Sequence, residues 1–180
     1  MTSLLLRPWR QSDAGALAAA YGGSSDLERQ LDPEAGTVSG AEGIIREDLG
    51  WDPQVACNLA VVAGGTAVGN AGISRIDLRH GTAWTYYWLA APARGNGAAA
   101  RAVATLARWA AEELELHRLE LGHRTNNPAS CRVARAAGFT AEGIQRDKLR
   151  YDGQRFDVEI HARLATDPVP DLQLLELHLP

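Results

Sequence analysis

The pattern of hydrophobic and polar positions is clearest in the middle of the chain. From Ala99 onward, apolar residues recur at intervals of three and four, and charged residues lie on the opposite side. The apolar positions are Val103, Leu106, Ala107, Ala110 and Leu114, and the charged ones are Arg101, Arg108, Glu112 and Glu115. This spacing predicts an amphipathic helix. The aromatic run TAWTYYWLA before it predicts a strand.

Strand signals flank this central unit. Two β-branched runs around Gly64–Gly65 predict a hairpin. The segment from residue 139 to residue 164 predicts a second hairpin, with its turn at Asp152–Gly153. SLLLRPW and RLELGH predict single strands.

Three further helices are expected. Ser12 or Asp13 caps the first, in QSDAGALAAAYGG, and AEGIIREDLGW forms the second. In NNPASCRVARAAGF, Asn127 is placed to cap the third and Gly138 to end it. Residues 24–40 predict a long loop or a broken helix.

The order of these elements predicts an α/β (α+β) fold with one mixed sheet. Antiparallel strands come first and a single β-α-β crossover follows, so we expect six or seven strands with helices on both faces. Residues 1–166 form the expected domain, and residues 167–180 form a tail that docks or makes a short helix.

Composition narrows the functional classes. The chain has 180 residues, 46% of them hydrophobic, and a net charge of −4, which indicates a soluble globular protein and argues against a nucleic-acid binder. The cysteines, Cys57 and Cys131, make no C-x-x-C pair, and no H-E-x-x-H occurs, so no metal site is expected. Neither a secretory signal nor a membrane span is evident, and a cytoplasmic location is expected.

The glycine-rich turn RGNGAA, between the aromatic strand and the central helix, carries candidate chemistry. Backbone N–H groups at a helix start attract anions, and glycines let a phosphate approach the backbone. Gly95, Gly97 and Ala100 also match the dinucleotide pattern G-x-G-x-x-[GA], with Glu120 as a candidate ribose ligand, so an NAD-binding oxidoreductase is one alternative. A tight turn without any ligand is another.

Three motifs in order resemble one known family. Arg94, Gly97 and Ala99 fit [QR]-x-x-G-x-[GA], NPASCRVARAAGFTAEG follows downstream, and LLLRPWRQSDAGAL stands at the start. From Leu4 to Leu164, the chain resembles the GNAT N-acetyltransferases of the RimJ/RimL type. The resemblance implies the GNAT fold and direct transfer of an acetyl group from acetyl-CoA to a primary amine within a ternary complex. The amine is a peptide or protein N-terminus or a small molecule, and a homodimer is common in the family.

The resemblance also implies site residues. A backbone N–H near Leu89, at a bulge of the strand before the glycine turn, polarises the thioester carbonyl. Pantetheine lies along Leu89, Ala90 and Ala91. Asn127 binds the pantetheine arm and Arg132 the nucleotide phosphates. The N–H groups that take the pyrophosphate are those of Arg94, Gly95, Asn96, Gly97, Ala98 and Ala99.

The resemblance identifies the catalytic acid and the catalytic base less completely. Ser130 matches the proposed acid of the RimL-type branch, whereas Ala134 stands where many members carry a Tyr acid. A simpler interpretation is that Asn127 and Ser130 only cap a helix. Leu149 stands where a base carboxylate is expected. The alternatives are a water relay or one of Glu120, His123, Glu142 and Asp147, while His117 and His161 are expected to be structural or surface residues.

The site that binds the acceptor amine is expected to be formed by residues 24–43, the helix after them and the last hairpin. Five acidic residues in this segment favour a cationic amine, although a solvated loop explains them equally well: Asp26, Glu28, Asp32, Glu34 and Glu42. Trp51, Trp84 and Trp88 are candidates to line the site or the core. The missing carboxylate at Leu149 leaves one more alternative, a degenerate domain that binds acyl-CoA without turnover.

Overall fold

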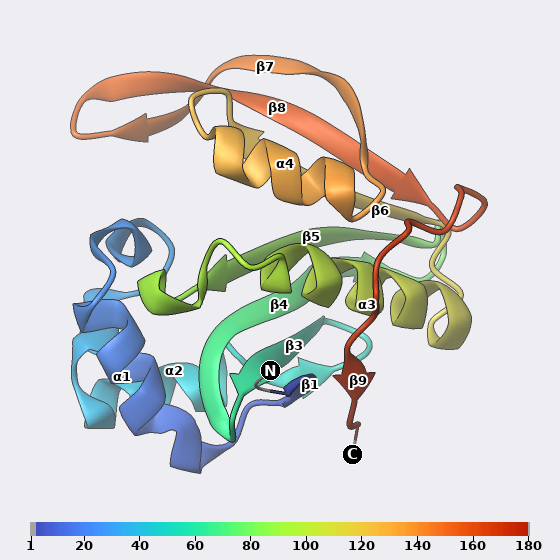
Figure 1. Ribbon diagram of the computed structural model, residues 1–180. Helices are drawn as coiled ribbons and strands as arrows, with labels where there is room; N and C mark the ends of the chain where they lie inside the picture. The colour runs from blue at the N-terminus through green and yellow to red at the C-terminus, as the bar shows by residue number, and fades with distance from the viewer. Residues whose placement is uncertain (1–2, 180) are drawn as a thin grey trace.

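One mixed sheet organises the computed structural model, which describes residues 3–179 (Figure 1). Within these residues nine strands pair in the order β7-β8-β6-β5-β4-β3-β1-β9, with β2 paired to β3. The strands are β1 Leu4–Pro8, β2 Trp51–Asp52, β3 Ala56–Ala63, β4 Thr66–Asp77, β5 Thr82–Leu89, β6 Arg118–Arg124, β7 Thr140–Tyr151, β8 Gln154–Leu164 and β9 Glu176–Leu177.

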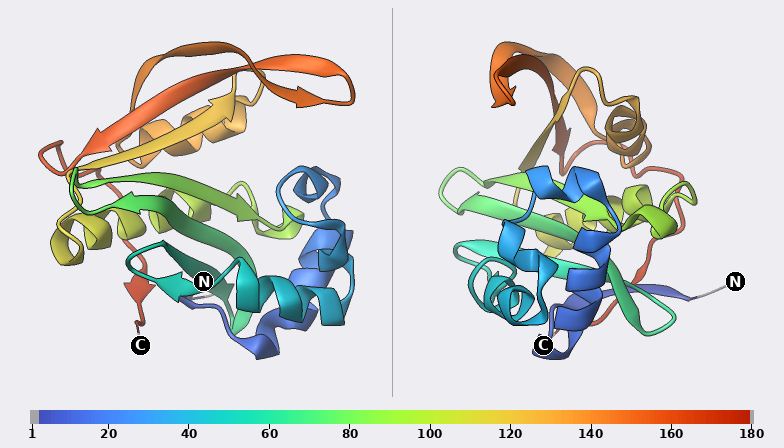
Figure 2. Two further views of the ribbon diagram at one scale, coloured as in Figure 1. Left: turned by 180° about the vertical axis from the view of Figure 1, so that it is seen from behind. Right: turned by 90° about the vertical axis from the view of Figure 1, so that its left-hand side faces the viewer.

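Four α-helices cover the two faces of the sheet. They are α1 Ala14–Gly22, α2 Val38–Glu47, α3 Ala98–Glu113 and α4 Pro128–Ala136. Alternate residues of a strand point to opposite faces, so Leu59 and Val61 of β3 join the core under α3 and α4, whereas Ala60 and Val62 join the core under α1 and α2. Figure 1 looks onto the face with α3 and α4, and the rear view in Figure 2 has the strands in front of these helices.

The two halves of the sheet separate between β5 and β6. These parallel strands pair only from Thr82–Arg118 to Trp84–Glu120, although β5 continues to Leu89. β4 stays paired with β5 up to Leu89, and β8 stays paired with β6 up to Arg124. The two strands diverge toward the end of β5, as Figure 1 shows. The edge of β5 that faces β6 therefore has no partner strand beyond Trp84 in the described chain.

Most of the predicted elements are confirmed, including both hairpins and the helix beginning near Ala99. The expectation of six or seven strands was too low, because β2 and β9 are each two residues long and too short to give an alternating pattern. Residues 24–40 form a broken helix with two short 3-10 turns, Ser25–Arg29 and Pro33–Gly36. α2 begins at Val38, earlier than expected, because the Thr37 hydroxyl caps it by accepting the Gly40 N–H.

Up to Leu179, the C-terminal segment docks as a strand and forms no helix. Leu5 and Leu6 of β1 pair in parallel with Glu176 and Leu177 of β9. Leu175 is buried, and the three leucines Leu172, Leu174 and Leu177 pack against the core on the α3 face. The segment from Asp167 onward thus extends the same sheet as the rest of the chain.

The described sheet is mostly antiparallel. A dinucleotide-binding oxidoreductase needs a doubly wound parallel sheet, whereas only the β5–β6 and β1–β9 pairs of the described sheet are parallel. The fold therefore contradicts the NAD alternative. In residues 3–179, no helix is both long enough and apolar enough to cross a bilayer.

Candidate functional site

The glycine turn opens onto the start of α3. Gly95 and Gly97 have φ of +84° and +80°, a left-handed conformation that glycine adopts without strain. A Cβ added at either position would meet no atom within 4 Å, so the backbone borders open space. The Asn96 side chain accepts the Ala98 N–H at 3.0 Å. The N–H groups of Ala99 and Ala100 have no acceptor in the described chain. With the dipole of a 16-residue helix behind them, these groups favour an anion.

The end of β5 presents a second free backbone donor. Ala90 N–H donates to the Val68 carbonyl of β4 at 2.8 Å. Hydrogen bonds alternate along an antiparallel pair, so the N–H of Leu89 points away from β4, toward the side where β6 has separated. The bulge expected in β5 is instead in β4, where the pairs Val61–Gly69 and Val62–Ala67 leave Val68 as the extra residue.

The first turn of α4 closes the site from the other half of the sheet. The Asn127 side chain caps the helix by accepting the Ser130 N–H at 3.1 Å. The Tyr87 hydroxyl of β5 donates to the Ser130 carbonyl, also at 3.1 Å. Asn127 therefore caps α4, as its place before Pro128 predicted, whereas the Ser130 hydroxyl takes no part in the cap.

A pocket of about 400 Å³ joins these three features. Nine of the predicted site residues line it: Leu89, Arg94, Gly95, Gly97, Ala98, Ala99, Asn127, Ser130 and Arg132. Ala90, Ala91 and Asn96 are not among the lining residues. The Ala91 N–H is already used, because it donates to the Ser24 hydroxyl at 2.9 Å. Arg94 N–H donates to the Ala91 carbonyl at 3.3 Å, so it too is engaged.

The Arg94 side chain links the pocket to the acidic segment. Its Nε donates to the Leu89 carbonyl at 2.8 Å, and its guanidinium pairs with Asp26 at 3.0 Å. Asp32 is also engaged, because it caps the turn at Pro33 by accepting the Glu34 N–H. Two of the five acidic residues of this segment therefore have structural roles, and the others, Glu28, Glu34 and Glu42, are exposed.

Tyr87 is a lining residue that sequence reasoning missed. Burial raises the pKa of its phenol, and the hydrogen bond to Ser130 acts in the opposite direction. The hydroxyl is therefore a protonated donor at neutral pH. Period-two alternation could have found Tyr87, because it lies two residues before Leu89 on the same side of β5. Gln30 also lines the pocket and carried no recognisable signal, whereas Asp26, another lining residue, was expected on the acceptor side.

The candidate bases lie outside the pocket. Glu120 and Glu142 both pair with Arg118, whose hydrogen bond lowers the pKa of Glu142. Asp147 is exposed on β7, and His123 is buried among other polar side chains. None of these four residues lines the pocket, and neither does Leu149, which pairs with Phe156 on the last hairpin.

The tryptophans divide between the core and the pocket. Trp88 is 5% exposed and lines the pocket. Its ring centroid lies 5.9 Å from that of Trp9. Trp51 stacks against Trp109 at 4.9 Å between ring centroids, on the core side of the sheet. Only Trp88 of the three candidates borders the described pocket.

A sequence profile of the acetyltransferase (GNAT) domain family matches residues 3–140. An open glycine cradle beside separated parallel strands agrees with that match, and the chain belongs to the GNAT acetyltransferase family.

Two relatives from Bacillus subtilis (strain 168) are similar in sequence. "Probable N-acetyltransferase YjcK" is 37% identical over 86 residues, which is 48% of each protein. YdaF is 30% identical over 118 residues, or 63% of this chain and 64% of YdaF. The alignments thus span about half of YjcK and just under two thirds of YdaF.

Solved structures share the fold over almost the whole chain. The RimL ribosomal L7/L12 α-N-protein acetyltransferase in complex with coenzyme A has a TM-score of 0.82 at 23% identity, covering 91% of this chain and 95% of that one. The microcin C7 self-immunity acetyltransferase MccE, in complex with acetyl-CoA and AMP, has a TM-score of 0.78 at 20% identity, covering 90% and 92%. At these identities, the likeness defines the fold.

Proposed function

We propose that the protein is an N-acetyltransferase that transfers the acetyl group of acetyl-CoA to a primary amine. The observation that carries this proposal is that the glycine cradle, the free edge of β5 and Ser130 all line one pocket. Membership of the GNAT family supports it. The coenzyme A and acetyl-CoA bound to the two structural neighbours agree with it.

In the proposed complex, the pyrophosphate lies against the start of α3. The backbone of Gly95 and Gly97 borders open space, the N–H groups of Ala99 and Ala100 are free to bind the phosphate oxygens, and the helix dipole adds partial positive charge. Arg132 is exposed on α4 and supplies a cation for the nucleotide phosphates. Pantetheine passes between β5 and α4 and replaces the missing strand partner of Leu89. The side-chain NH₂ of Asn127 remains available to bind this arm, because the cap uses only its oxygen.

The reaction follows from this placement. The amine nitrogen attacks the thioester carbon, a C–N bond forms and the C–S bond breaks, with no covalent enzyme intermediate. The Leu89 N–H stabilises the negative charge that develops on the carbonyl oxygen. The Ser130 hydroxyl protonates the leaving thiolate and takes a proton back from solvent. The attacking amine gives its proton to water, because the only carboxylate among the lining residues, Asp26, is paired with Arg94.

A second candidate function is binding of an acyl-CoA without turnover. Leu149 at the expected base position and the absence of an unpaired carboxylate among the lining residues favour it. This function shares the cofactor site with the enzyme, so cofactor binding alone does not separate the two. Amine-dependent release of free CoA does, because only the enzyme releases it.

Calorimetric titration tests the cofactor site. Wild-type protein is titrated with acetyl-CoA and with NAD, and Gly97→Asp is compared with Gly97→Asn. Both side chains tolerate a left-handed backbone and have similar size, but only Asp places a negative charge at the cradle. We expect wild type and Gly97→Asn to bind acetyl-CoA and Gly97→Asp to lose binding. Binding of NAD, or equal behaviour of the two variants, would contradict the proposed site.

The acceptor, the cellular location and the oligomeric state are part of the same proposal. The acceptor is a protein N-terminus, as for RimJ/RimL-type enzymes, or a small cationic amine. The protein works in the cytoplasm, where its two free thiols, Cys57 and Cys131, stay reduced. It forms a homodimer, which light scattering during size-exclusion chromatography measures directly.

A further inference from the structure

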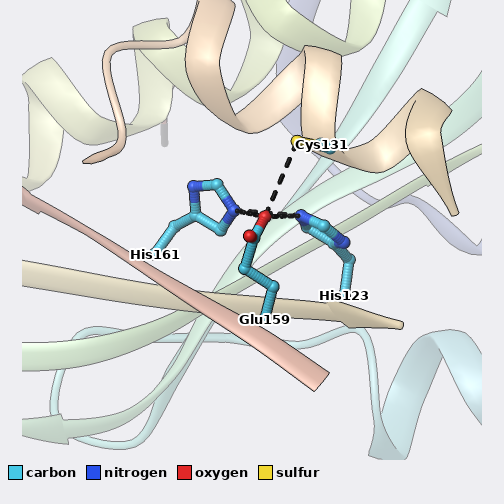
Figure 3. A group of neighbouring side chains, drawn as sticks. All are labelled: His123, Cys131, Glu159 and His161. Atoms are coloured by element: carbon cyan, nitrogen blue, oxygen red, sulfur yellow. Dashed lines mark hydrogen bonds and ion pairs between the residues drawn. The ribbon is translucent and has the colours of Figure 1, made fainter. Parts of the chain in front are cut away.

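Four potential metal ligands converge between α4 and the sheet, apart from the proposed acetyl-CoA pocket (Figure 3). His123 on β6 and Glu159 on β8 are register partners, so their side chains share one face. His161 follows Glu159 by two residues and points to the same face. Cys131 approaches from α4. None of the four lines the pocket.

The donor atoms of the four side chains lie close to one another. The Nε2 atoms of His123 and His161 lie 3.0 Å apart. Oε2 of Glu159 lies 2.8 Å from the His161 Nε2, 3.4 Å from the His123 Nε2 and 3.6 Å from the Cys131 sulfur. All four ligand atoms lie within 4.8 Å of one another. A tetrahedral zinc site with Zn–N near 2.0 Å and Zn–S near 2.3 Å has edges of about 3.3–3.7 Å. The two separations that involve the His161 Nε2 are shorter because hydrogen bonds join these atoms, so the atoms move apart by about 0.3–0.5 Å when the ion enters.

The surroundings also suit a metal ion. The Nδ1 of His123 lies 3.0 Å from the Arg124 carbonyl. A proton on that nitrogen leaves a lone pair on Nε2, which is the ligand form of a histidine held by an outer partner. His161 is fully buried, His123 is nearly so, and the Glu159 side chain is 22% exposed, which leaves one side open for an ion to enter.

The donor set indicates which metal fits. Two imidazoles, one thiolate and one carboxylate are the ligands of Zn²⁺ and related ions, whereas Mg²⁺ and Ca²⁺ prefer oxygen alone. We propose that His123, Cys131, Glu159 and His161 form a tetrahedral site for Zn²⁺ or a similar divalent transition-metal ion. The ion joins α4 to β6 and β8.

Metal uptake changes the protonation of the site in a defined way. The Cys131 thiol loses its proton on forming the metal–sulfur bond, and that proton leaves to solvent. On His161 the ring proton moves from Nε2 to Nδ1, so the imidazole stays neutral. The ion therefore takes the place of two hydrogen-bonded protons, one on Cys131 and one on His161, and makes four metal–ligand bonds.

The position suggests a structural role. Cys131 directly follows Ser130, whose backbone holds both the Asn127 cap and the Tyr87 bond. A metal bond from Cys131 to the strands would hold this first turn of α4 against β6 and β8. The ion stabilises the wall of the pocket without touching a ligand in it.

Cobalt(II) titration of the chelator-treated protein tests the site. Co²⁺ is the probe because tetrahedral coordination gives intense visible bands and a thiolate ligand gives a near-ultraviolet charge-transfer band. We expect one Co²⁺ per chain, both kinds of band, and displacement by Zn²⁺. Failure of Co²⁺ to bind stoichiometrically, or binding without the charge-transfer band, would overturn the proposal.

Two variants and one matched control complete the design. Cys131→Ser removes the charge-transfer band and weakens binding by more than about 100-fold, since even loss of an outer-sphere partner costs about 10- to 100-fold. Glu159→Gln keeps the band but weakens affinity. Cys57→Ala removes the only other thiol, which is buried in the core, and leaves the spectrum unchanged. A band that survives in Cys131→Ser or disappears in Cys57→Ala would refute the ligand set.

The unfolding temperature with and without Zn²⁺ distinguishes loss of the metal site from misfolding of a variant. Zn²⁺ raises the unfolding temperature of wild type and Cys57→Ala by mass action, because only the folded chain assembles the four ligands. Cys131→Ser, with a cooperative transition of its own, shows a much smaller rise. An equal rise in all three proteins would place the bound ion elsewhere.

Discussion

The hydroxyl of Tyr87 donates a 3.1 Å hydrogen bond to the backbone carbonyl of Ser130, and this bond joins β5 to α4 where β5 and β6 have separated. β5 offers the free Leu89 edge, and α4 offers Asn127, Ser130 and the exposed Arg132. No strand of the described chain fills the space between β5 and α4, so contacts of this kind hold the two elements together. The bond therefore links the two sides of the pocket.

Loss of this bond is expected to weaken acetyl-CoA binding. Tyr87→Phe removes one hydrogen bond, which costs about 1 kcal/mol of stability, and loosens α4 relative to β5. We expect the acetyl-CoA Kd to rise about three- to tenfold. Calorimetry and urea unfolding measure the two effects.

The neighbouring tyrosine provides the matched control. Tyr86 donates to Asn58 Oδ1 at 2.7 Å, outside the pocket. Tyr86→Phe loses a comparable bond and a comparable amount of stability, but should leave the acetyl-CoA Kd unchanged. Equal loss of affinity in both variants would show that general destabilisation, and not the β5–α4 link, weakens binding.

Ser130→Ala is expected to separate chemistry from binding. The bonds of Ser130 to Asn127 and Tyr87 use its backbone, so the variant removes the hydroxyl and keeps the cap. We expect kcat for acetyl transfer to fall about 100-fold or more, the range for loss of a positioned acid. The KM for acetyl-CoA should stay near the wild-type value, and Ser130→Cys should recover part of the rate.

Asn127→Ala serves as the contrast to Ser130→Ala. Loss of the cap costs about 1 kcal/mol, and the pantetheine arm loses a donor, so the KM for acetyl-CoA rises with a smaller change in kcat. If Ser130→Ala keeps the wild-type kcat, the hydroxyl is not the acid.

The Arg7–Asp13 pair is expected to control acid stability. It is bidentate, at 2.7 and 2.8 Å, and nearly buried. Burial alone raises the pKa of Asp13, but hydrogen bonds from Arg7 and the Arg10 amide overcome this, and the pKa of Asp13 is lowered. The stability from this lowered pKa is present above the unfolded value, near about 4, and is lost as pH falls through the folded value.

Asp13→Asn tests this dependence. At pH 7, it leaves Arg7 buried without its counter-charge, and we expect a loss of about 3–5 kcal/mol in unfolding free energy. Its stability should also vary less with pH than that of wild type in the acid range. Asp26→Asn, which breaks the exposed pair with Arg94, should cost less than about 1 kcal/mol. Parallel pH profiles of wild type and Asp13→Asn would contradict the assignment.

The exposed acidic residues are expected to affect the amine alone. Changing Glu28, Glu34 and Glu42 to Gln should raise the KM for a cationic amine several-fold and leave the KM for acetyl-CoA unchanged. A triple variant of Glu112, Glu113 and Glu115, which are exposed at and just beyond the far end of α3, removes the same charge elsewhere. If both triple variants behave alike, the segment is only a solvated surface.

Local signals made much of the cradle predictable. Gly95, Gly97 and the Asn127–Pro128 helix start each carry a conformational preference within a few residues, and the structure has the left-handed turn and the cap at those positions. The separation of β5 from β6 depends instead on pairing across the sheet, so no short segment encodes it. β9 is too short to show alternation.

The group of His123, Cys131, Glu159 and His161 was hidden for a similar reason. Its members come from three elements and follow no metal-binding spacing, and the absence of such spacing led to the expectation that no metal binds. Register brings His123 opposite Glu159, and helix packing brings Cys131 to both. His161, which was expected to be structural or exposed, is fully buried.

Acetyl transfer to a defined amine is the most direct test of the account. Wild-type protein is incubated with acetyl-CoA and either a polyamine or peptides that begin with serine or alanine, and mass spectrometry follows the amine while free CoA is measured. We predict one acetyl group on an amine, CoA release in equal amount, and a much slower reaction with Ser130→Ala. Tight acetyl-CoA binding without acetylation of any amine would contradict the account and identify the chain as an acyl-CoA-binding domain.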